Sequence, residues 1–244
     1  MDRNRRVAVV VGVMFIVATV GALISTALVS PILGAPDYLT RIPANEGQVL
    51  WGAFFQFIAG AACPAIALAM YPVLRRDNEG LALGSVGFRL IEGALYVVIV
   101  VVLLLLVTLS HETAQAGGSA SSASQVAAVL LMAGRDWLGP VAAVLTFGLG
   151  ALMYYVALYR SQLVPRWLSA WGILGTAMLM VSAVLVLFRL AAPLSTTQAV
   201  LALPIAVQEM ALAVWLIAKG FNPPATTAEP ALEASPWSVA PSAG

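Results

Sequence analysis

The chain has 244 residues, of which 61% are hydrophobic and only 9% are charged, and its formal net charge is +1. Soluble globular proteins carry about 25% charged residues, so this composition, with a mean hydropathy of +0.95, excludes an ordinary soluble fold. A net charge near zero gives no reason to expect nucleic-acid binding. The composition predicts an integral membrane protein whose main partner is the lipid bilayer.

The chain contains one cysteine and one histidine. Cys63 alone cannot form an intramolecular disulfide or a cysteine metal cluster, and His111 alone cannot supply a bis-histidine haem site. The sequence also lacks a nucleotide-binding loop. We therefore expect no cofactor and no metal, and an enzyme is the least favoured functional class.

Six apolar segments each reach the roughly 20 residues that a helix needs to cross a bilayer. The first, Val7–Val29, is longer than the core of a secretory signal, which is about 7–15 residues, so it predicts a retained anchor helix. The sequence thus predicts an all-α fold, a six-helix transmembrane bundle over residues 1–220. The expected spans are approximately 7–29, 49–74, 81–109, 137–159, 167–188 and 199–218.

The connections between the spans are polar or rich in small residues. The link between the first two spans contains Pro36 and Pro43, and we expect it outside the membrane, with room for a short interfacial helix. The stretch from Gly117 to Ser122 predicts a flexible exterior loop, because small polar residues cannot offset the entropy of ordering. Residues 221–244 are dominated by Ala, Pro, Thr, Ser and Glu, which predicts a disordered cytoplasmic tail.

Basic residues of a membrane protein gather on its cytoplasmic side. Only Arg41 and Arg189 lie in the connections of one side, and Arg89 and Arg135 belong to helices. The other eight of the twelve basic residues mark the opposite side, which predicts a cell-membrane protein with both termini in the cytoplasm. These eight residues are Arg3, Arg5, Arg6, Arg75, Arg76, Arg160, Arg166 and Lys219.

Several glycines lie within the predicted spans. Small residues let transmembrane helices approach closely, because lipid tails remove the usual hydrophobic drive between helices. These glycines form no clean GxxxG motif, so they predict close packing inside one bundle, and a dedicated oligomer face is the weaker alternative. They are Gly12, Gly21, Gly60, Gly148, Gly150, Gly172 and Gly175.

Ionisable residues inside a membrane span are costly and are therefore candidates for function. Arg89 and Glu92 lie three residues apart and share a helix face with Tyr96. A rise of about 1.5 Å per residue places Arg89, Glu92 and Glu209 at similar depth, ~12 to ~16 Å from the cytoplasmic end. We therefore expect a cluster of these three charges. Gln208 is a further candidate, although it lies about 100° around the helix from Glu209.

Two carboxylates beside one guanidinium leave one excess negative charge. Such a cluster can hold a proton or attract a small cation. The same residues can instead form an ion-pair network that fixes helix register. A third interpretation is that Arg89 reaches the headgroups with Glu92 merely as its partner. The sequence leaves these alternatives open.

A second polar set lies near the predicted exterior end. Gln56 is about seven residues into the second span, and Arg135 and Asp136 immediately precede the fourth. Trp51 and Trp137 belong at the same interface, as aromatic-belt residues do. An interfacial Arg–Asp pair beside tryptophan usually anchors a helix, and this is the favoured interpretation here.

Tyrosines mark the other end of the fourth span. Tyr154, Tyr155 and Tyr159 are predicted to lie at the inner membrane interface, where the ring is half in lipid and the hydroxyl is in water. This interpretation makes them belt residues rather than members of a site.

Three stretches of the chain form a recognisable pattern. They are Gly87-Phe88-Arg89-Leu90-Ile91-Glu92, the link between residues 159 and 168, and the segment from Pro204 to Gly220. In this order they resemble the bacterial integral-membrane family known as domain of unknown function 4386. The resemblance covers roughly residues 5–220. It implies a six-helix membrane protein and supplies no established activity.

Two functions fit these observations. The favoured one is a small transporter or channel whose pathway includes Arg89, Glu92 and Glu209, with a titratable carboxylate for proton or cation coupling. The alternative is a structural, assembly or sensory membrane protein whose buried charges only fix helix packing. A water-accessible cavity reaching Glu209 would favour transport, and a dry, fully paired cluster would favour the alternative.

Overall fold

The computed structural model describes residues 3–116 and 121–222, and every regular element in these ranges is helical. Six helical stretches are long and apolar enough to cross a membrane. The described chain is therefore an all-α, multi-pass membrane protein. Residues 117–120 and 223–244, which carry most of the predicted loop and tail, lie outside the described residues.

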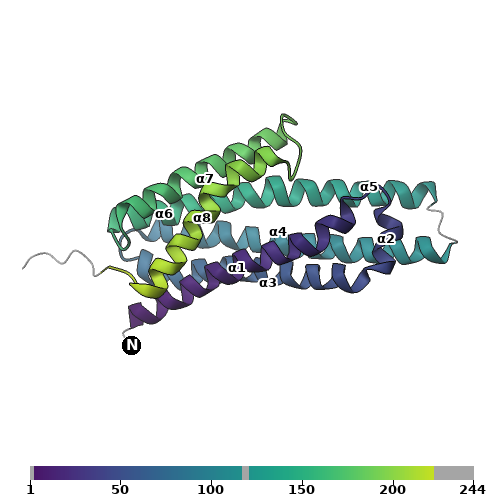
Figure 1. Ribbon diagram of the computed structural model, residues 1–244. Helices are drawn as coiled ribbons and strands as arrows, with labels where there is room; N and C mark the ends of the chain where they lie inside the picture. Colours follow the sequence, from purple (N-terminus) through teal and green to yellow (C-terminus); the bar gives the residue numbers. More distant parts are fainter. Residues whose placement is uncertain (1–2, 117–120, 223–244) are drawn as a thin grey trace, which may run out of the picture.

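The first half of the chain forms three long helices and one short one. They are α1 (Arg3–Leu33), α2 (Tyr38–Ala44), α3 (Glu46–Leu74) and α4 (Glu79–Gln115). Helix α1 packs along α3, and α3 packs along α4 (Figure 1). The short α2 occupies the predicted exterior link, as an interfacial helix would.

The second half closes the bundle. One continuous helical stretch consists of α5 (Ser122–Trp137), the π-helical turn η1 (Leu138–Ala143) and α6 (Val144–Ser161), and it is followed by α7 (Arg166–Leu187) and α8 (Thr196–Ala218). Helix α6 packs on α4 and α7, and α8 packs on both α7 and α1. The long helices therefore form a closed ring.

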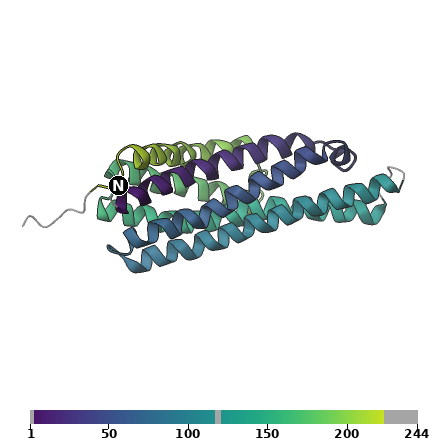
Figure 2. The same cartoon turned by 90° about the horizontal axis from the view of Figure 1, so that it is seen from below.

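The two ends of the ring differ. Figures 1 and 2 show that the N-terminus lies at the same end as the C-terminal end of α8, whereas α2 lies at the opposite end. We call these the terminal end and the distal end. Helices α7 and α8 are shorter than α4 and the α5–α6 stretch, and their connecting turn lies part-way along the bundle in Figure 1.

The start of the fourth span differs from the prediction. The helix begins at Ser122 rather than at Trp137, so Arg135 and Asp136 lie inside a continuous helix and do not precede it. The side chain of Ser121 accepts a hydrogen bond of 3.1 Å from the Ser124 amide and caps the helix. Helix α5 also packs on the long α4. The apolar residues of α5 therefore belong to the helix and not to the preceding loop.

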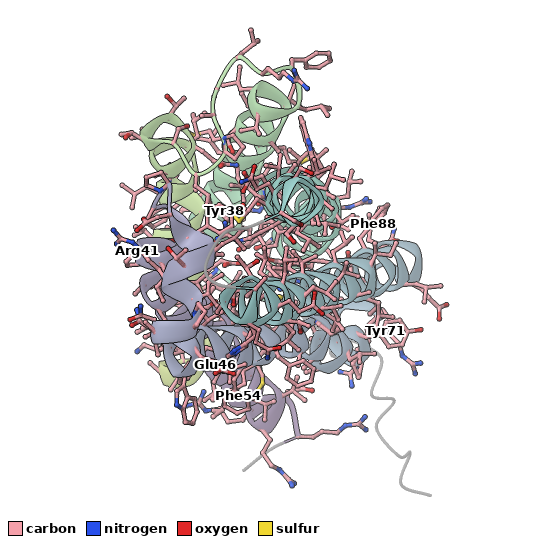
Figure 3. All side chains as sticks on the ribbon, turned by 90° about the vertical axis from the view of Figure 1, so that its right-hand side faces the viewer. Tyr38, Arg41, Glu46, Phe54, Tyr71 and Phe88 are labelled. Carbon is pink, nitrogen blue, oxygen red and sulfur yellow. The ribbon has the colours of Figure 1, made fainter. Side chains whose placement is uncertain are left out.

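Polar contacts join the elements at the distal end. His111 of α4 lies 3.1 Å from the Glu46 carboxylate of α3. Arg41 donates a 2.7 Å hydrogen bond to Asp37, and this bond lowers the pKa of the Asp37 carboxyl. Figure 3, which looks along the bundle from this end, shows Arg41 and Phe54 on its outer side. Phe54 is 50% exposed, as expected of a side chain that faces lipid.

The terminal end is tied together by backbone capping. Arg5 donates hydrogen bonds of 2.8 and 2.5 Å to the carbonyls of Leu216 and Ile217, at the C-terminus of α8. Phe221 packs against the core, and the Asn222 side chain donates to the Gln162 carbonyl at 2.9 Å. Phe221 and Asn222, which were predicted to belong to the tail, therefore contact the bundle.

Glycines bring the helices of the ring into close contact. A Cβ atom at Gly12 of α1 would lie 2.7 Å from the Ala213 carbonyl oxygen of α8. One at Gly175 of α7 would lie 2.9 Å from the Ile205 amide nitrogen of α8. These distances are too short for any real Cβ contact, so close packing at the predicted glycines is confirmed.

Candidate functional site

The ring of helices contains two adjoining cavities. The central cavity has a volume of about 320 Å³ and is lined by Arg89, Glu92 and Glu209. The distal cavity has a volume of about 480 Å³ and is lined by Arg135 and Asp136, together with Gln56. Residues of both walls come from α1, α4, α6, α7 and α8, namely Ala22, Thr26, Tyr96, Val144, Leu179 and Ala202. The structure thus places the two polar sets in neighbouring cavities that share part of their walls.

Arg89 and Glu92 form a buried ion pair on α4. The distance from Arg89 Nη1 to Glu92 Oε2 is 2.9 Å, and each side chain is 2% exposed. Arg89 Nε donates a 3.3 Å hydrogen bond to the Cys63 carbonyl of α3, and its guanidinium carbon lies 5.0 Å from the centre of the Phe147 ring. The ring and the carbonyl hold the guanidinium between α3 and α6.

The ion pair keeps unused hydrogen-bonding capacity. Arg89 Nη1 and Glu92 Oε2 are close, but neither atom has a hydrogen bond of good geometry within the described chain. Both side chains line the central cavity. Buried polar atoms without such partners are costly, so they are suited to receive a water, an ion or a ligand from the cavity.

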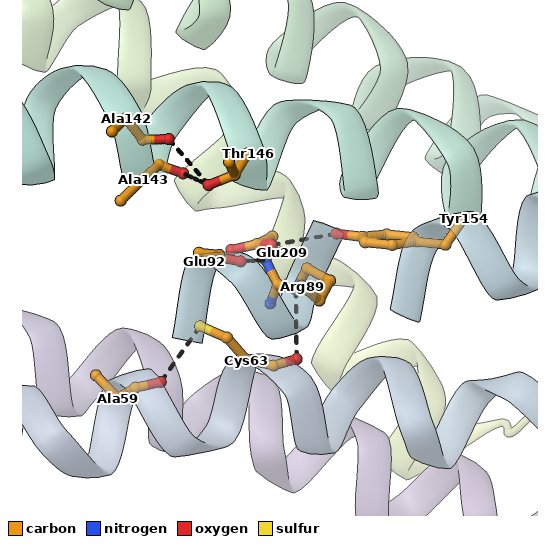
Figure 4. A network of polar contacts seen from close by, with 9 residues as sticks. All are labelled: Ala59, Cys63, Arg89, Glu92, Ala142, Ala143, Thr146, Tyr154 and Glu209. Atoms are coloured by element: carbon orange, nitrogen blue, oxygen red, sulfur yellow. Dashed lines mark hydrogen bonds and ion pairs between the residues drawn. The ribbon is translucent and has the colours of Figure 1, made fainter. Parts of the chain in front are cut away.

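Glu209 approaches this pair from α8. Figure 4 draws it beside Arg89 and Glu92, with Tyr154 of α6 reaching toward it. The Tyr154 hydroxyl donates a long hydrogen bond of 3.4 Å to Glu209 Oε1, and the Arg89 and Glu92 charges act on the same carboxyl. Across the described residues, no basic nitrogen lies within ion-pair distance of Glu209. The excess negative charge of the cluster therefore belongs to Glu209.

Gln208 is not a member of the cluster. It is fully buried, accepts a hydrogen bond from the Tyr155 hydroxyl and donates one of 3.0 Å to the Leu168 carbonyl of α7. Consecutive helical residues point about 100° apart, so Gln208 faces α6 and α7 while Glu209 faces the cavity. Including Gln208 among the cluster candidates was wrong for this reason.

The belt interpretation is also wrong for two tyrosines. Tyr154 and Tyr155 are 1% and 0% exposed and lie in the core, whereas Tyr159 is 39% exposed. A signal for Tyr154 was present in the sequence, because Phe147 and Gly150 share its helix face at seven and four residues' spacing. Gly150 leaves room for Arg89, whose Cγ would lie 3.2 Å from a Cβ there.

The distal cavity is shaped by a break in regular α-helix. The π-helical turn η1 contains Pro140, which has no amide hydrogen to donate. Gln198 of α8 donates a 3.1 Å hydrogen bond to the Pro140 carbonyl, and Thr146 donates to the carbonyls of Ala142 and Ala143 (Figure 4). The Gln198 bond joins the start of α8 to this turn, and both residues line the distal cavity. Sequence reasoning missed this turn.

Arg135 and Asp136 lie on the wall of this cavity. The distance from Arg135 Nη1 to Asp136 Oδ1 is 3.7 Å, and the side chains are 17% and 35% exposed. This separation is too long for a hydrogen bond. No group of three or more His, Cys, Asp or Glu side chains within the described ranges is arranged to hold a metal ion.

Comparison with known proteins identifies the family to which the chain belongs. No curated protein and no solved structure matches the chain. Residues 10–220 match a family described as a domain of unknown function, DUF4386. This range includes every side chain placed above in the central and distal cavities, and it agrees with the resemblance carried by the segments at residues 87–92, 159–168 and 204–220. The chain belongs to the DUF4386 family of membrane proteins.

Proposed function

We propose that the protein is a small transporter coupled to a proton or a small cation. Its pathway runs from the distal cavity into the central cavity and ends at Glu209. The observation that carries this proposal is the shared wall, which includes Tyr96 and Ala202 and joins the two cavities. Ionisable groups that line a cavity inside a membrane bundle commonly mark such a pathway.

Glu209 is the coupling residue in this proposal. Its only hydrogen-bond partner in the described chain is the Tyr154 hydroxyl, whereas Glu92 is already paired with Arg89. One positive and two negative charges leave a site that is neutral when Glu209 takes up a proton. A proton or a small cation at Glu209 therefore balances the charge of the central cavity.

The path is closed beyond Glu209. Between this residue and the terminal end lies a packed core in which Leu158, Leu212 and Leu216 are 0% exposed. The cavity reaching Glu209 thus adjoins the distal cavity rather than the terminal end. Passage to the terminal end requires α8 to move away from this core, as alternating access demands.

The direction of the pathway follows from the basic residues. The terminal end carries Arg75, Arg76, Arg160 and Arg166 in its turns and helix ends. We place this end in the cytoplasm of a cell, with the chain in the cell membrane. With this orientation the distal cavity lies on the exterior side, which in our proposal is an outward-facing state.

One alternative role for the buried charges is purely structural. The Arg89 and Glu92 side chains are each 2% exposed. A buried ion pair of this kind can have no role other than fixing the packing of helices. In that case Glu209 would bind no proton from the distal side. The packing role and the transport role therefore differ in one measurable property, which is whether the protein moves charge across the membrane.

A pH jump on proteoliposomes adsorbed to a solid-supported membrane separates them. The wild-type protein should give a transient current, Glu209→Gln should reduce it at least tenfold, and Glu112→Gln should keep it. Glu112 is the matched control, because it lies at the exposed end of α4 and outside both cavities. A wild-type current equal to that of empty liposomes, or one unchanged in Glu209→Gln, would favour the packing role.

A further inference from the structure

The distal cavity contains two charged groups that the proposed proton path does not use. Arg135 and Asp136 are separated by 3.7 Å, and no hydrogen bond to either side chain is present in residues 3–116 and 121–222. A guanidinium has about five N–H donors, and a carboxylate accepts about four hydrogen bonds. Both groups are mostly withdrawn from water, with exposures of 17% and 35%. Both side chains line the distal cavity.

The rest of the wall is mainly apolar. Val29, Ile99 and Leu103 line it, and the neighbouring polar groups are neutral, such as Gln56 and Ser25. A volume of about 480 Å³ falls within the range of small-molecule sites, which is roughly 300–1,000 Å³. An apolar cavity with a few convergent polar groups is the usual form of such a site.

The charges of Arg135 and Asp136 determine which charges a ligand of the distal cavity should carry. A simple anion that pairs with Arg135 would lie beside the Asp136 carboxylate, and a simple cation that pairs with Asp136 would lie beside the guanidinium. Like charges at such distances are unfavourable in a partly dry site. A ligand with both an oxyanion and an ammonium group pairs every charge and adds no net charge to the membrane interior.

We propose that the distal cavity binds a zwitterionic amphiphile. Its oxyanion contacts Arg135, its ammonium group contacts Asp136, and its apolar body lies against Val29 and Ile99. This inference rests on the proposed function and names the substrate class of that transporter. The same chemistry occurs in a free amino acid with a large apolar side chain and in a phospholipid headgroup with phosphate and ammonium groups.

Calorimetric titration of the full-length protein in maltoside detergent tests the charge requirement. Three probes share one ring system: L-tryptophan carries both charges, tryptamine only the ammonium, and indole-3-propionate only the carboxylate. We expect L-tryptophan to bind at least tenfold more tightly than either singly charged probe. A fourth probe, lysophosphatidylethanolamine, represents the lipid source. Tight binding of this probe with none of L-tryptophan assigns the site to a headgroup.

Variants assign the binding to the distal cavity. Arg135→Gln and Asp136→Asn should each weaken binding of the preferred zwitterion at least tenfold. Arg135→Lys, which keeps the charge and loses the planar fork, should be intermediate. Arg41→Gln is the matched control, because Arg41 is in an exposed ion pair outside both cavities and its loss should leave binding unchanged.

Two results would overturn the inference. One is that neither zwitterion binds more tightly than the singly charged probes. The other is that Arg135→Gln and Arg135→Lys, still folded, bind as the wild type does. Glu209→Gln separates this inference from the transport proposal, since it should retain zwitterion binding while it loses the pH-jump current.

Discussion

Arg89 is among the largest buried side chains of the described residues, and its surroundings explain how a membrane bundle tolerates it. The charge is balanced by Glu92, one nitrogen is bonded to the Cys63 carbonyl, and the guanidinium lies over the Phe147 ring. Because the guanidinium is planar and weakly hydrated, it can use an acid, a carbonyl and a ring at once. A lysine would lose the ring and carbonyl geometry.

Removing only one member of this ion pair should be strongly destabilising. Arg89→Met leaves the Glu92 carboxylate buried without a counter-ion, so we expect a loss of about 3–5 kcal/mol in the free energy of unfolding. The double variant Arg89→Met/Glu92→Met should recover most of the loss, because apolar groups can replace a buried pair. Unfolding in mixed detergent micelles measures both. A double variant no more stable than Arg89→Met would contradict this account.

Two adjacent tyrosines differ in their partners and should differ in their effect. Tyr155 donates to the fully buried Gln208, so Tyr155→Phe leaves an amide oxygen without its partner and should cost about 1–3 kcal/mol. Tyr154 makes only a 3.4 Å bond to Glu209, and Tyr154→Phe should cost less than about 1 kcal/mol. The same unfolding assay ranks the two variants, and equal losses would show that the partners do not decide the effect.

At the scale of the helices, α8 connects the cavities to the closed core. Its start is bound to η1 through Gln198, its middle carries Glu209, and its end is capped by Arg5. It also meets α7 and α1 at glycines. The packing of α8 therefore determines both where Glu209 points and whether the terminal end stays closed.

Close packing of α8 against α7 predicts a strong effect of one methyl group. Gly175→Ala places a Cβ 2.9 Å from the Ile205 amide nitrogen and 3.0 Å from its Cα, and a helix backbone cannot give way locally. We expect a loss of about 1–3 kcal/mol, measured by unfolding in detergent.

Gly87→Ala is the control for that substitution. No atom lies within 4 Å of a Cβ at Gly87 in the described chain, so alanine should stabilise α4 by up to about 1 kcal/mol. Similar effects of the two substitutions would show that helix propensity, not packing, governs Gly175.

At the scale of the whole molecule, the sequence predicted how deep a residue lies in the membrane. It did not predict how each helix is rotated about its own axis. Hydropathy indicated six spans, and counting residues placed Arg89, Glu92 and Glu209 at one level, where they line the same cavity. The rotation of each helix depends on side chains of its neighbours, which the sequence of one helix does not contain. That is why the buried Tyr154 was expected at the membrane interface.

The start of the fourth span was missed for a different reason. A hydropathy argument places a helix where residues are apolar, and the stretch around Arg135 and Asp136 contains two charges. In the folded chain these charges face a cavity, and the helix continues through them to Ser122. Charged residues beside an apolar stretch can mark the end of a helix or the wall of a cavity, and the local sequence does not distinguish the two.

The proposed pathway requires that the central cavity is open to water at the distal end and closed at the terminal end. Cysteine accessibility measures this directly, in a Cys63→Ala background and with a small cationic methanethiosulfonate reagent. Ala206 of α8 lines the central cavity and is exposed, whereas Ala213, two turns further along, is 0% exposed. Ser121→Cys and Asp77→Cys report the distal and terminal sides.

In right-side-out vesicles, Ala206→Cys should react with external reagent, as Ser121→Cys does. Asp77→Cys should react only after permeabilisation, and Ala213→Cys should stay unmodified throughout. This pattern would support a water-filled path from the exterior to Glu209. An Ala206→Cys thiol that reacts only from the Asp77 side, or from neither side, would contradict it.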